Sequence, residues 1–287
     1  MKKSKFWFWL FVGPILLAFL TVVIVPMFRG FYFSFTEWNG ISNNVNLIGF
    51  ENYARALTDE EFIHSFFFTA KFAAVSVVMI NMIGFGLALL VTQGLKGSNI
   101  QRSIFFMPNL IGGLVLGFVW QFIFTKAFDA FGSTWGIPFF EGWLSTTGTG
   151  FWGLVILMSW QMSGYMMIIY IAAIQSIPES LNEAAKIDGA NAWHRLLNIT
   201  IPMVMPAFTI GLFLSLSNSF KLFDQNLALT RGGPYGSTEM LALNIYQTAF
   251  SRNQLGYAQA KAVIFLLAVA FITLTQIYYT KKKEVEM

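Results

Sequence analysis

Long apolar blocks without charged residues dominate the pattern of this chain. Lys71, near the start of the second block, is the one charged residue that they contain. Each block is close to the roughly 20 residues that an α-helix needs to cross about 30 Å of hydrocarbon. Their continuous apolar character excludes the strands of a membrane barrel, which alternate apolar and polar positions. The pattern therefore predicts an all-α, polytopic membrane protein with six transmembrane helices in one membrane domain, residues 1–287. The six blocks are 7–28, 66–91, 104–125, 151–175, 203–220 and 262–280.

Composition supports this prediction and excludes other classes. The 287 residues are 56% hydrophobic and only 11% charged, against about 25% charged in an average soluble protein. The absence of cysteine excludes a disulfide scaffold. The net charge of +4 is small and forms no basic run, so the sequence predicts no nucleic-acid partner. The partner that the composition does predict is a lipid bilayer.

The first block could instead be a secretory signal, because Lys2, Lys3 and Lys5 precede it. Its apolar run from Phe6 to Val25 is longer than the apolar region of a signal, which has about 7–15 residues. The run also ends at a Pro-Met-Phe sequence and not at a small-residue cleavage site. We therefore expect a retained membrane anchor.

The distribution of basic residues predicts the orientation in the membrane. One set of connections carries 10 Lys and Arg in short loops and termini, and the other carries 6 in longer loops. Because cytoplasmic loops are enriched in Lys and Arg, the first set should be cytoplasmic. The chain is therefore expected to be a multi-pass protein of the cell membrane with both termini in the cytoplasm. The inner set is Lys2, Lys3, Lys5, Lys96, Arg102, Lys186, Arg195, Lys281, Lys282 and Lys283.

Local signals predict several helix ends and contacts. Thr58 and Glu61 form an S/T-x-x-E start signal for a helix that runs into the second block. Pro108 should kink the third block. Gly112, Gly113 and Gly117 on that block would allow another helix to approach closely.

The loop 176–202, on the predicted cytoplasmic side, has the pattern of two short helices. Ser176 and Glu179 form a capping box, and Gly189 suits the end of the first helix. Asn191 can cap a second helix, which Pro202 should stop before the fifth block. The small Ala184 and Ala185 would let another protein approach the backbone, while Glu183 and Asp188 offer charge to a basic partner. An interfacial hairpin that only joins two spans has the same features, so the residues alone leave both interpretations open.

This loop resembles the EAA loop of ATP-binding-cassette (ABC) importer permeases. The matching residues are Glu183-Ala184-Ala185, then Gly189 after three intervening residues, then Ile199-Thr200-Ile201-Pro202 after nine more. Asp188-Gly189-Ala190 resembles the sugar-importer subset, and two outer sequences resemble the carbohydrate uptake type 1 permeases. These are Gly49-Phe50-Glu51-Asn52-Tyr53 and Thr230-Arg231-Gly232-Gly233-Pro234, the second preceded by Lys221 and Phe223-Asp224.

The resemblance implies a type I ABC importer permease fold and a division of labour. The implied partners are a second homologous permease subunit, a dimer of ABC ATPases and an extracytoplasmic solute-binding protein. Glu183, Ala184, Ala185, Asp188 and Gly189 would couple the chain to the ATPase. The chain has no G-x-x-x-x-G-K-[ST] phosphate loop, so no enzyme activity or cofactor is expected on it. ATP and Mg would bind the partner.

Polar residues within spans are costly and are therefore candidates for a solute pathway. Amides and hydroxyls bind sugars well, so the solute expected from the resemblance, a sugar or oligosaccharide, fits them. An interhelical hydrogen bond, worth only about 0.6–2 kcal/mol, would explain each residue within a span without a ligand. Lys221 and Asp224 would also fit an outer gate or an ion pair with the second permease subunit. The candidates are Asn81, Gln121, Gln161, Tyr165 and Asn218, followed by Lys221 and Asp224 at the outer end of the fifth block.

Three other functions are weighed against an importer permease. An ion-driven secondary transporter predicts buried acidic residues, but all 14 Asp and Glu lie outside the six blocks. An intramembrane enzyme has no recognisable H-E-x-x-H or G-x-S-x-G motif, and the two histidines, His64 and His194, fall on opposite sides of the membrane. We therefore expect no catalytic residues and no metal site. A purely structural scaffold would leave the loop 176–202 unexplained.

Overall fold

The computed structural model describes residues 2–42, 45–94 and 97–284, so Lys96 of the inner basic set lies outside the described residues. The described residues are almost entirely helical, with one isolated antiparallel bridge between Thr36 and Leu47. They divide into two compact units, residues up to Ile63 with Asn244–Leu267, and His64–Leu243 with the residues from Ala268. The two long helices α4 and α14 are each divided between the units.

The first unit contains the first span and the loop that follows it. Trp7–Phe33 is long and apolar enough to cross a membrane, and none of its most apolar stretch is buried. In this unit, α3 (Glu51–Ala56) is held by Asn52, whose buried amide donates to the carbonyls of Ser34 (3.0 Å) and Thr36 (2.9 Å). Its elements are α1 (Lys2–Phe19), the π turn η1 (Leu20–Ile24), α2 (Val25–Phe33), α3, the start of α4 (Glu60–Val91), the second half of α13 (Leu241–Tyr246), the π turn η6 (Gln247–Ser251) and the start of α14 (Leu255–Lys281).

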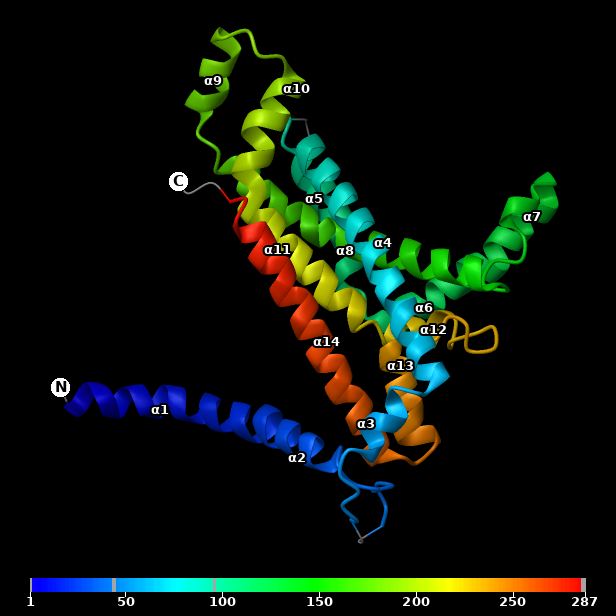
Figure 1. The fold of residues 1–287 in the computed structure, drawn as a ribbon. Helices are drawn as coiled ribbons and strands as arrows, with labels where there is room; N and C mark the ends of the chain where they lie inside the picture. The colour runs from blue at the N-terminus through cyan, green and yellow to red at the C-terminus, as the bar shows by residue number, and fades with distance from the viewer. Residues whose placement is uncertain (1, 43–44, 95–96, 285–287) are drawn as a thin grey trace. The chain divides into compact units, whose positions relative to one another are not determined.

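The second unit is built around α8 (Thr147–Gln175), which lies beside α11 (Figure 1). Of its most apolar stretch, 72% is buried, because small residues let neighbours pack against it. A Cβ atom at Gly164 would lie 1.8 Å from the carbonyl oxygen of Phe105. The other elements of the second unit are most of α4, α5 (Ser98–Phe106), η2 (Met107–Leu110), α6 (Gly113–Phe122), η3 (Ile123–Ala127), α7 (Phe128–Trp135), η4 (Pro138–Phe140), α9 (Glu179–Ile187), α10 (Ala192–Arg195), η5 (Leu196–Thr200), α11 (Ile201–Phe220), α12 (Asp224–Leu229), the first half of α13 and the end of α14.

Six helices in the described part of the chain are long and apolar enough to span a membrane, as the sequence predicts. The third is Gly113–Trp135, so the prediction of 104–125 is wrong in its bounds. Pro108 lies in the 3₁₀ turn η2, and Ile111 and Gly112 then have extended ψ angles of 129° and 141°. The chain is therefore broken between α5 and α6 where only a kink was expected. A proline, which lacks an N–H, and a glycine within four residues weaken helix propagation enough for this break.

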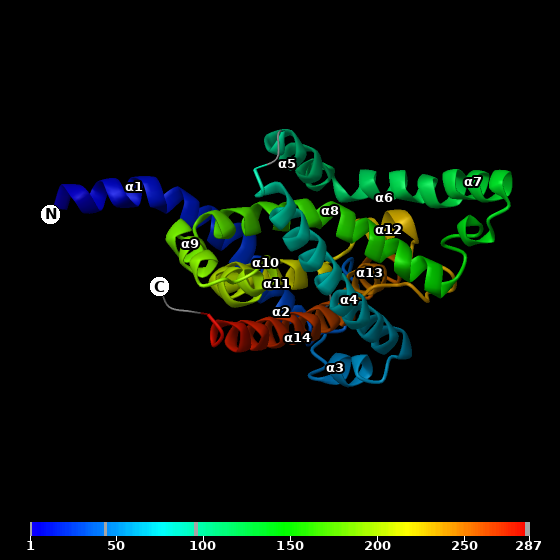
Figure 2. The ribbon, with the colours of Figure 1, turned by 90° about the horizontal axis from the view of Figure 1, so that it is seen from above.

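The glycines of the third span allow the close approach that was predicted. In Figure 2, α6 lies beside α12, and these two helices form the tightest pairing of the second unit. A Cβ at Gly117 would lie 2.5 Å from that of Ala228, and a Cβ at Gly113 would lie 2.8 Å from that of Asp224. A Cβ at Gly112 would have no neighbour within 4 Å, so this glycine does not allow a close helix contact. It lies instead at the break between α5 and α6.

Two predicted helix ends differ from the structure. The helix into the second block begins at Glu60, and its cap is Asp59, which accepts the Phe62 N–H at 3.1 Å, not Thr58. Pro202 does not stop a helix before the fifth span, because Ala192–Phe220 is continuous through the π turn η5. The wider π turn changes the hydrogen-bond register just before the proline, so its missing N–H is tolerated.

Candidate functional site

A polar hollow of about 230 Å³ lies in the second unit, among η2, α8, α11 and α12. It brings together four of the predicted pathway residues, Gln161 and Tyr165 from α8, Asn218 from α11 and Lys221 just after it. These residues are distant in the chain, so their convergence results from the packing of α8 against α11. The lining is completed by Asn109, Met158, Met162, Leu222 and Gln225.

Hydrogen bonds fix part of this lining and leave part of it available. Gln161 donates to the carbonyl oxygen of Ile111 (3.2 Å) and accepts from the Gln225 amide (2.8 Å), so its orientation is set. The exposed Asn218 donates one N–H to the Leu214 carbonyl of its own helix at 2.9 Å. An amide side chain has a second N–H and an oxygen acceptor. Asn218 is therefore the lining residue best placed to exchange hydrogen bonds with a polar solute.

Asn109 and Gln225 are lining residues that the sequence prediction missed. Asn109 lies in the 3₁₀ turn η2, directly after Pro108, and Gln225 lies in the first turn of α12. A polar residue beside a proline inside an apolar block was the available signal for Asn109. Gln225 is adjacent to Asp224, but its approach to Gln161 depends on how α12 packs and has no signature in the sequence.

Asn81 and Asp224 do not line the hollow. Asn81 is buried, accepts the Tyr170 hydroxyl and donates to the Ser215 hydroxyl at 2.9 Å, so it links three helices of the second unit. This geometry fits the interhelical hydrogen bond that was the alternative for this residue. Asp224 is exposed in the first turn of α12, where its Cβ faces Gly113. Gln121 does not line the hollow either, and its side chain donates to the backbone carbonyl of Leu229 at 3.3 Å.

The predicted two-helix loop is present as a hairpin, α9 and α10, that projects beyond α8 and α11 in Figure 1. Gly189 follows α9 with φ +78°, a left-handed conformation that glycine adopts without strain. The N–H of His194 bonds to Asn191 Oδ1 at 2.9 Å, which confirms Asn191 as the second cap. Ser176 and Glu179 form no capping box, because the N-cap is Pro178 and the Ser176 hydroxyl donates back to Ala173.

The hairpin exposes both charge and apolar surface. Glu183, Ala184, Asp188 and Gly189 are exposed and Ala185 is half-buried. Large apolar side chains accompany them, with Ile187 86% and Trp193 65% exposed in the chain alone. Such exposure on a short connecting element is typical of a protein-binding surface. A second hollow, of about 690 Å³, lies between the hairpin and the end of α4 and is lined by Glu183, Lys186 and Arg195 among others.

The motif Gly232-Gly233-Pro234, which the sequence predicts to be in an outer loop, forms an ordered turn in the second unit. Gly232 has φ +80°, and the Gly233–Pro234 peptide bond is cis. The Thr238 side chain donates to the carbonyl oxygen of Gly233 at 2.6 Å, and Asn226 donates to the carbonyl of Thr238 at 2.8 Å. The loop thus presents Tyr235, which is fully exposed, on a fixed framework.

No group of three His, Asp or Glu side chains in the described part of the chain is placed to hold a metal ion. The six helices that are long and apolar enough to cross a membrane define the class of the protein as a multi-pass membrane protein.

The chain belongs to the family of binding-protein-dependent transport system inner membrane components, whose model matches residues 80–283. It is 54% identical to the probable starch degradation products transport system permease protein AmyD of Thermoanaerobacterium thermosulfurigenes, over 100% of this chain and 99% of that relative. It is 32% identical to the multiple sugar-binding transport system permease protein MsmF of Streptococcus mutans, over 98% of both chains. The trehalose/maltose transport system permease MalF of Thermococcus litoralis is 30% identical, over 94% of this chain and 91% of the relative.

The fold also matches a solved structure. A bacterial alginate ABC transporter, in complex with an alginate pentasaccharide-bound periplasmic protein, has a chain that superposes with a TM-score of 0.85 at 20% identity, covering 98% of this chain and 96% of that one. The type I ABC importer permease fold is therefore confirmed. The chain is a permease subunit of the carbohydrate uptake group of ABC importers, and it is not an enzyme, because ATP hydrolysis belongs to a separate subunit of such importers.

Proposed function

We propose that this subunit translocates oligosaccharides derived from starch, and that the hollow around Asn218 is part of their path. The 54% identity to a probable permease for starch degradation products, over the whole chain, supports this solute class. The convergence of Gln161, Tyr165, Asn218 and Lys221 in one hollow is the observation that carries the proposed path. Amide and hydroxyl groups exchange hydrogen bonds readily with sugar hydroxyls, which suits a solute that must bind and then leave.

The hairpin supplies the coupling in this proposal. The exposed Glu183 would meet a basic residue of the ATPase, and the small Ala184 and Ala185 would let its surface approach α9. Closure of an ATPase dimer that holds ATP and Mg would then move α11, which is continuous with α10. A second homologous permease and an external solute-binding protein complete the transporter, and both termini of this chain would be cytoplasmic.

The test replaces Asn218 with alanine in the complete transporter. We expect the apparent KM for uptake of labelled maltotriose to rise about tenfold, because a lost hydrogen bond of about 1 kcal/mol acts together with a changed lining. The amount of assembled transporter should not change. Thr134→Ala is the control, because Thr134 is also exposed and donates to the carbonyl of the residue four positions earlier, at 2.7 Å, but belongs neither to the lining of the hollow nor to the hairpin. Unchanged KM in Asn218→Ala would remove this residue from the path.

A further inference from the structure

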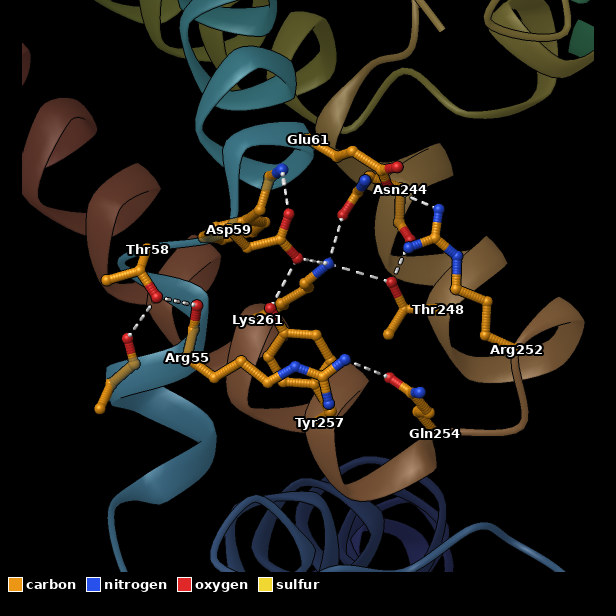
Figure 3. Close-up of polar contacts among 12 residues, drawn as sticks. Arg55, Thr58, Asp59, Glu61, Asn244, Thr248, Arg252, Gln254, Tyr257 and Lys261 are labelled. Carbon is orange, nitrogen blue, oxygen red and sulfur yellow. Dashed lines mark hydrogen bonds and ion pairs between the residues drawn. The ribbon is translucent and has the colours of Figure 1, made fainter.

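A cluster of polar side chains in the first unit is separate from the hollow and from the hairpin. Its centre is Lys261, a residue of α14 that is fully buried. Its Nζ atom lies 2.9 Å from Asp59 Oδ2, 2.9 Å from Asn244 Oδ1 and 3.1 Å from Thr248 Oγ1 (Figure 3). An ammonium group has three N–H donors, so each donor has an acceptor.

The acidic partner in this cluster is equally well satisfied. Asp59 Oδ2 also accepts the hydroxyl of Tyr257 at 2.6 Å, and Asp59 Oδ1 accepts the Phe62 N–H at 3.1 Å. The rings of Tyr257 and Phe62 lie 4.6 Å and 5.3 Å from Lys261 Nζ, within the range of cation–π contacts. A buried ion pair is tolerated when hydrogen bonds of this quality replace the lost water.

The cluster joins three parts of the first unit, of which the start of α4 is far from the other two in the chain. Asp59 caps the start of α4, Lys261 and Tyr257 lie near the start of α14, and Asn244 and Thr248 belong to α13 and the π turn η6. Each of the three elements contributes at least one bond to Lys261 or Asp59. Removing either charged residue would leave the other buried without its main partner, so all three elements depend on the pair.

Two exposed interactions lie next to this buried ion pair and provide a comparison with it. Arg252 forms an ion pair with Glu61, and the two side chains are 43% and 61% exposed. Arg55 donates to Gln254 Oε1 at 3.0 Å and lies over the Tyr257 ring. Exposed ion pairs contribute little because water and salt screen them, whereas a buried pair is sensitive to the loss of one member.

We propose that Asp59, Lys261 and Tyr257 are positioning residues for transport, which hold the predicted outer ends of α4 and α14 on η6 so that these ends move as one body. The proposal rests on the proposed function, because alternating access requires the outer ends of the spans to rearrange as solute is delivered. A buried ion pair suits such a joint since its geometry is specific, whereas apolar side chains would pack in several ways. Without the pair, delivery of solute at the outer face would no longer be converted into a concerted movement.

The test uses the complete transporter in proteoliposomes with its solute-loaded binding protein. The variants are Lys261→Met, Asp59→Asn and the double variant Asp59→Asn/Lys261→Met, with Glu61→Gln and Arg252→Gln as exposed-pair controls. Uptake and ATPase rates are expressed per assembled transporter, so a loss of folding alone does not change them. For each buried single variant we expect the maximal binding-protein-stimulated ATPase rate and uptake to fall about tenfold, while the binding-protein concentration at half-maximal stimulation stays constant. The double variant should recover to within threefold of wild type, and the controls should stay within twofold.

Tyr257→Phe keeps the ring and removes one hydrogen bond to Asp59, so it tests the joint even if the charge variants do not assemble. We expect its uptake per transporter to fall about threefold. The proposal is overturned if the assembled single variants retain wild-type stimulation, if the double variant is no better than the singles, or if Tyr257→Phe behaves as wild type. Absence of maltotriose uptake by the wild-type transporter would instead contradict the proposed function, which keeps the two failures distinct.

Discussion

At the scale of single residues, Asn81 and Asn218 show how packing separates two side chains of the same type. Both lie in apolar spans and have the same hydrogen-bonding groups. Asn81 is buried and bonded to Tyr170 and Ser215, while Asn218 is exposed in a polar hollow. The first therefore stabilises the helix packing, and the second is available to a solute.

The charge state of Asp59 leads to a prediction about pH. Burial by itself would raise the pKa of this carboxyl, but hydrogen bonds from Tyr257, Lys261 and the Phe62 N–H, together with the charge of Lys261, lower it from 3.8 to about 2. Because the folded pKa lies below the unfolded one, the stabilisation is fully present above about pH 4 and is lost as the pH falls through about 2. The shift corresponds to about 2 kcal/mol, which solvent screening reduces to roughly 1 kcal/mol because the carboxyl is only partly buried.

We therefore expect acid to destabilise the wild-type first unit between pH 4 and 2, with a smaller change in Asp59→Asn. Hydrogen exchange of the amides at the start of α4, in detergent-solubilised protein, measures this. Glu61→Gln is the control, because it removes an exposed carboxylate from the same turn and should leave the pH dependence as in wild type. Parallel curves for wild type and Asp59→Asn would show that Asp59 does not carry this stabilisation.

At the scale of elements, the third span and the hairpin differ in how far their local sequence determines their structure. The single proline near the start of the third block, Pro108, signals an irregularity, but the actual break at Ile111 and Gly112 places Asn109 in the hollow. The hairpin follows its sequence signals more closely, since Asn191 and Gly189 act at its turns as expected. Local capping chemistry decides the hairpin, whereas contacts with α8 and α12 decide the third span.

The exposed hairpin leads to a prediction for Glu183. We expect Glu183→Gln to weaken retention of the ATPase about tenfold, because a charge-assisted hydrogen bond contributes roughly 1.5–3 kcal/mol. Co-purification of the ATPase at increasing salt measures this effect, and the variant should insert into the membrane normally. Glu51→Gln, which changes an exposed helical glutamate of the first unit, is the control. Wild-type retention and transport in Glu183→Gln would exclude the coupling role.

At the scale of the whole molecule, the chain is a permease whose exposed surfaces imply partners. The first span is unburied within the chain, the hairpin exposes Ile187 and Trp193, and the loop with the Gly232-Gly233-Pro234 motif exposes Tyr235. An isolated subunit with these surfaces has no energy source of its own, because its sequence lacks a phosphate-binding loop. Transport therefore depends on other subunits.

This dependence gives a direct prediction. Proteoliposomes that contain the two permease subunits alone should take up no maltotriose under proton or sodium gradients. Addition of the ATPase with Mg-ATP inside and the loaded binding protein outside should start uptake. The control replaces ATP with a non-hydrolysable analogue. Gradient-driven uptake without the ATPase would instead support the secondary transporter that the sequence disfavours.

The sequence by itself determined the all-α class, the six apolar spans and the hairpin, because these follow from local periodicity, length and capping residues. It also supplied the motifs by which the resemblance to importer permeases was seen. Only the tertiary structure decided that Gln161, Asn218 and Gln225 meet in one hollow, that Asn81 does not, and that Lys261 is buried against Asp59. These outcomes depend on which faces of distant helices pack together, and no local pattern of residues encodes that choice.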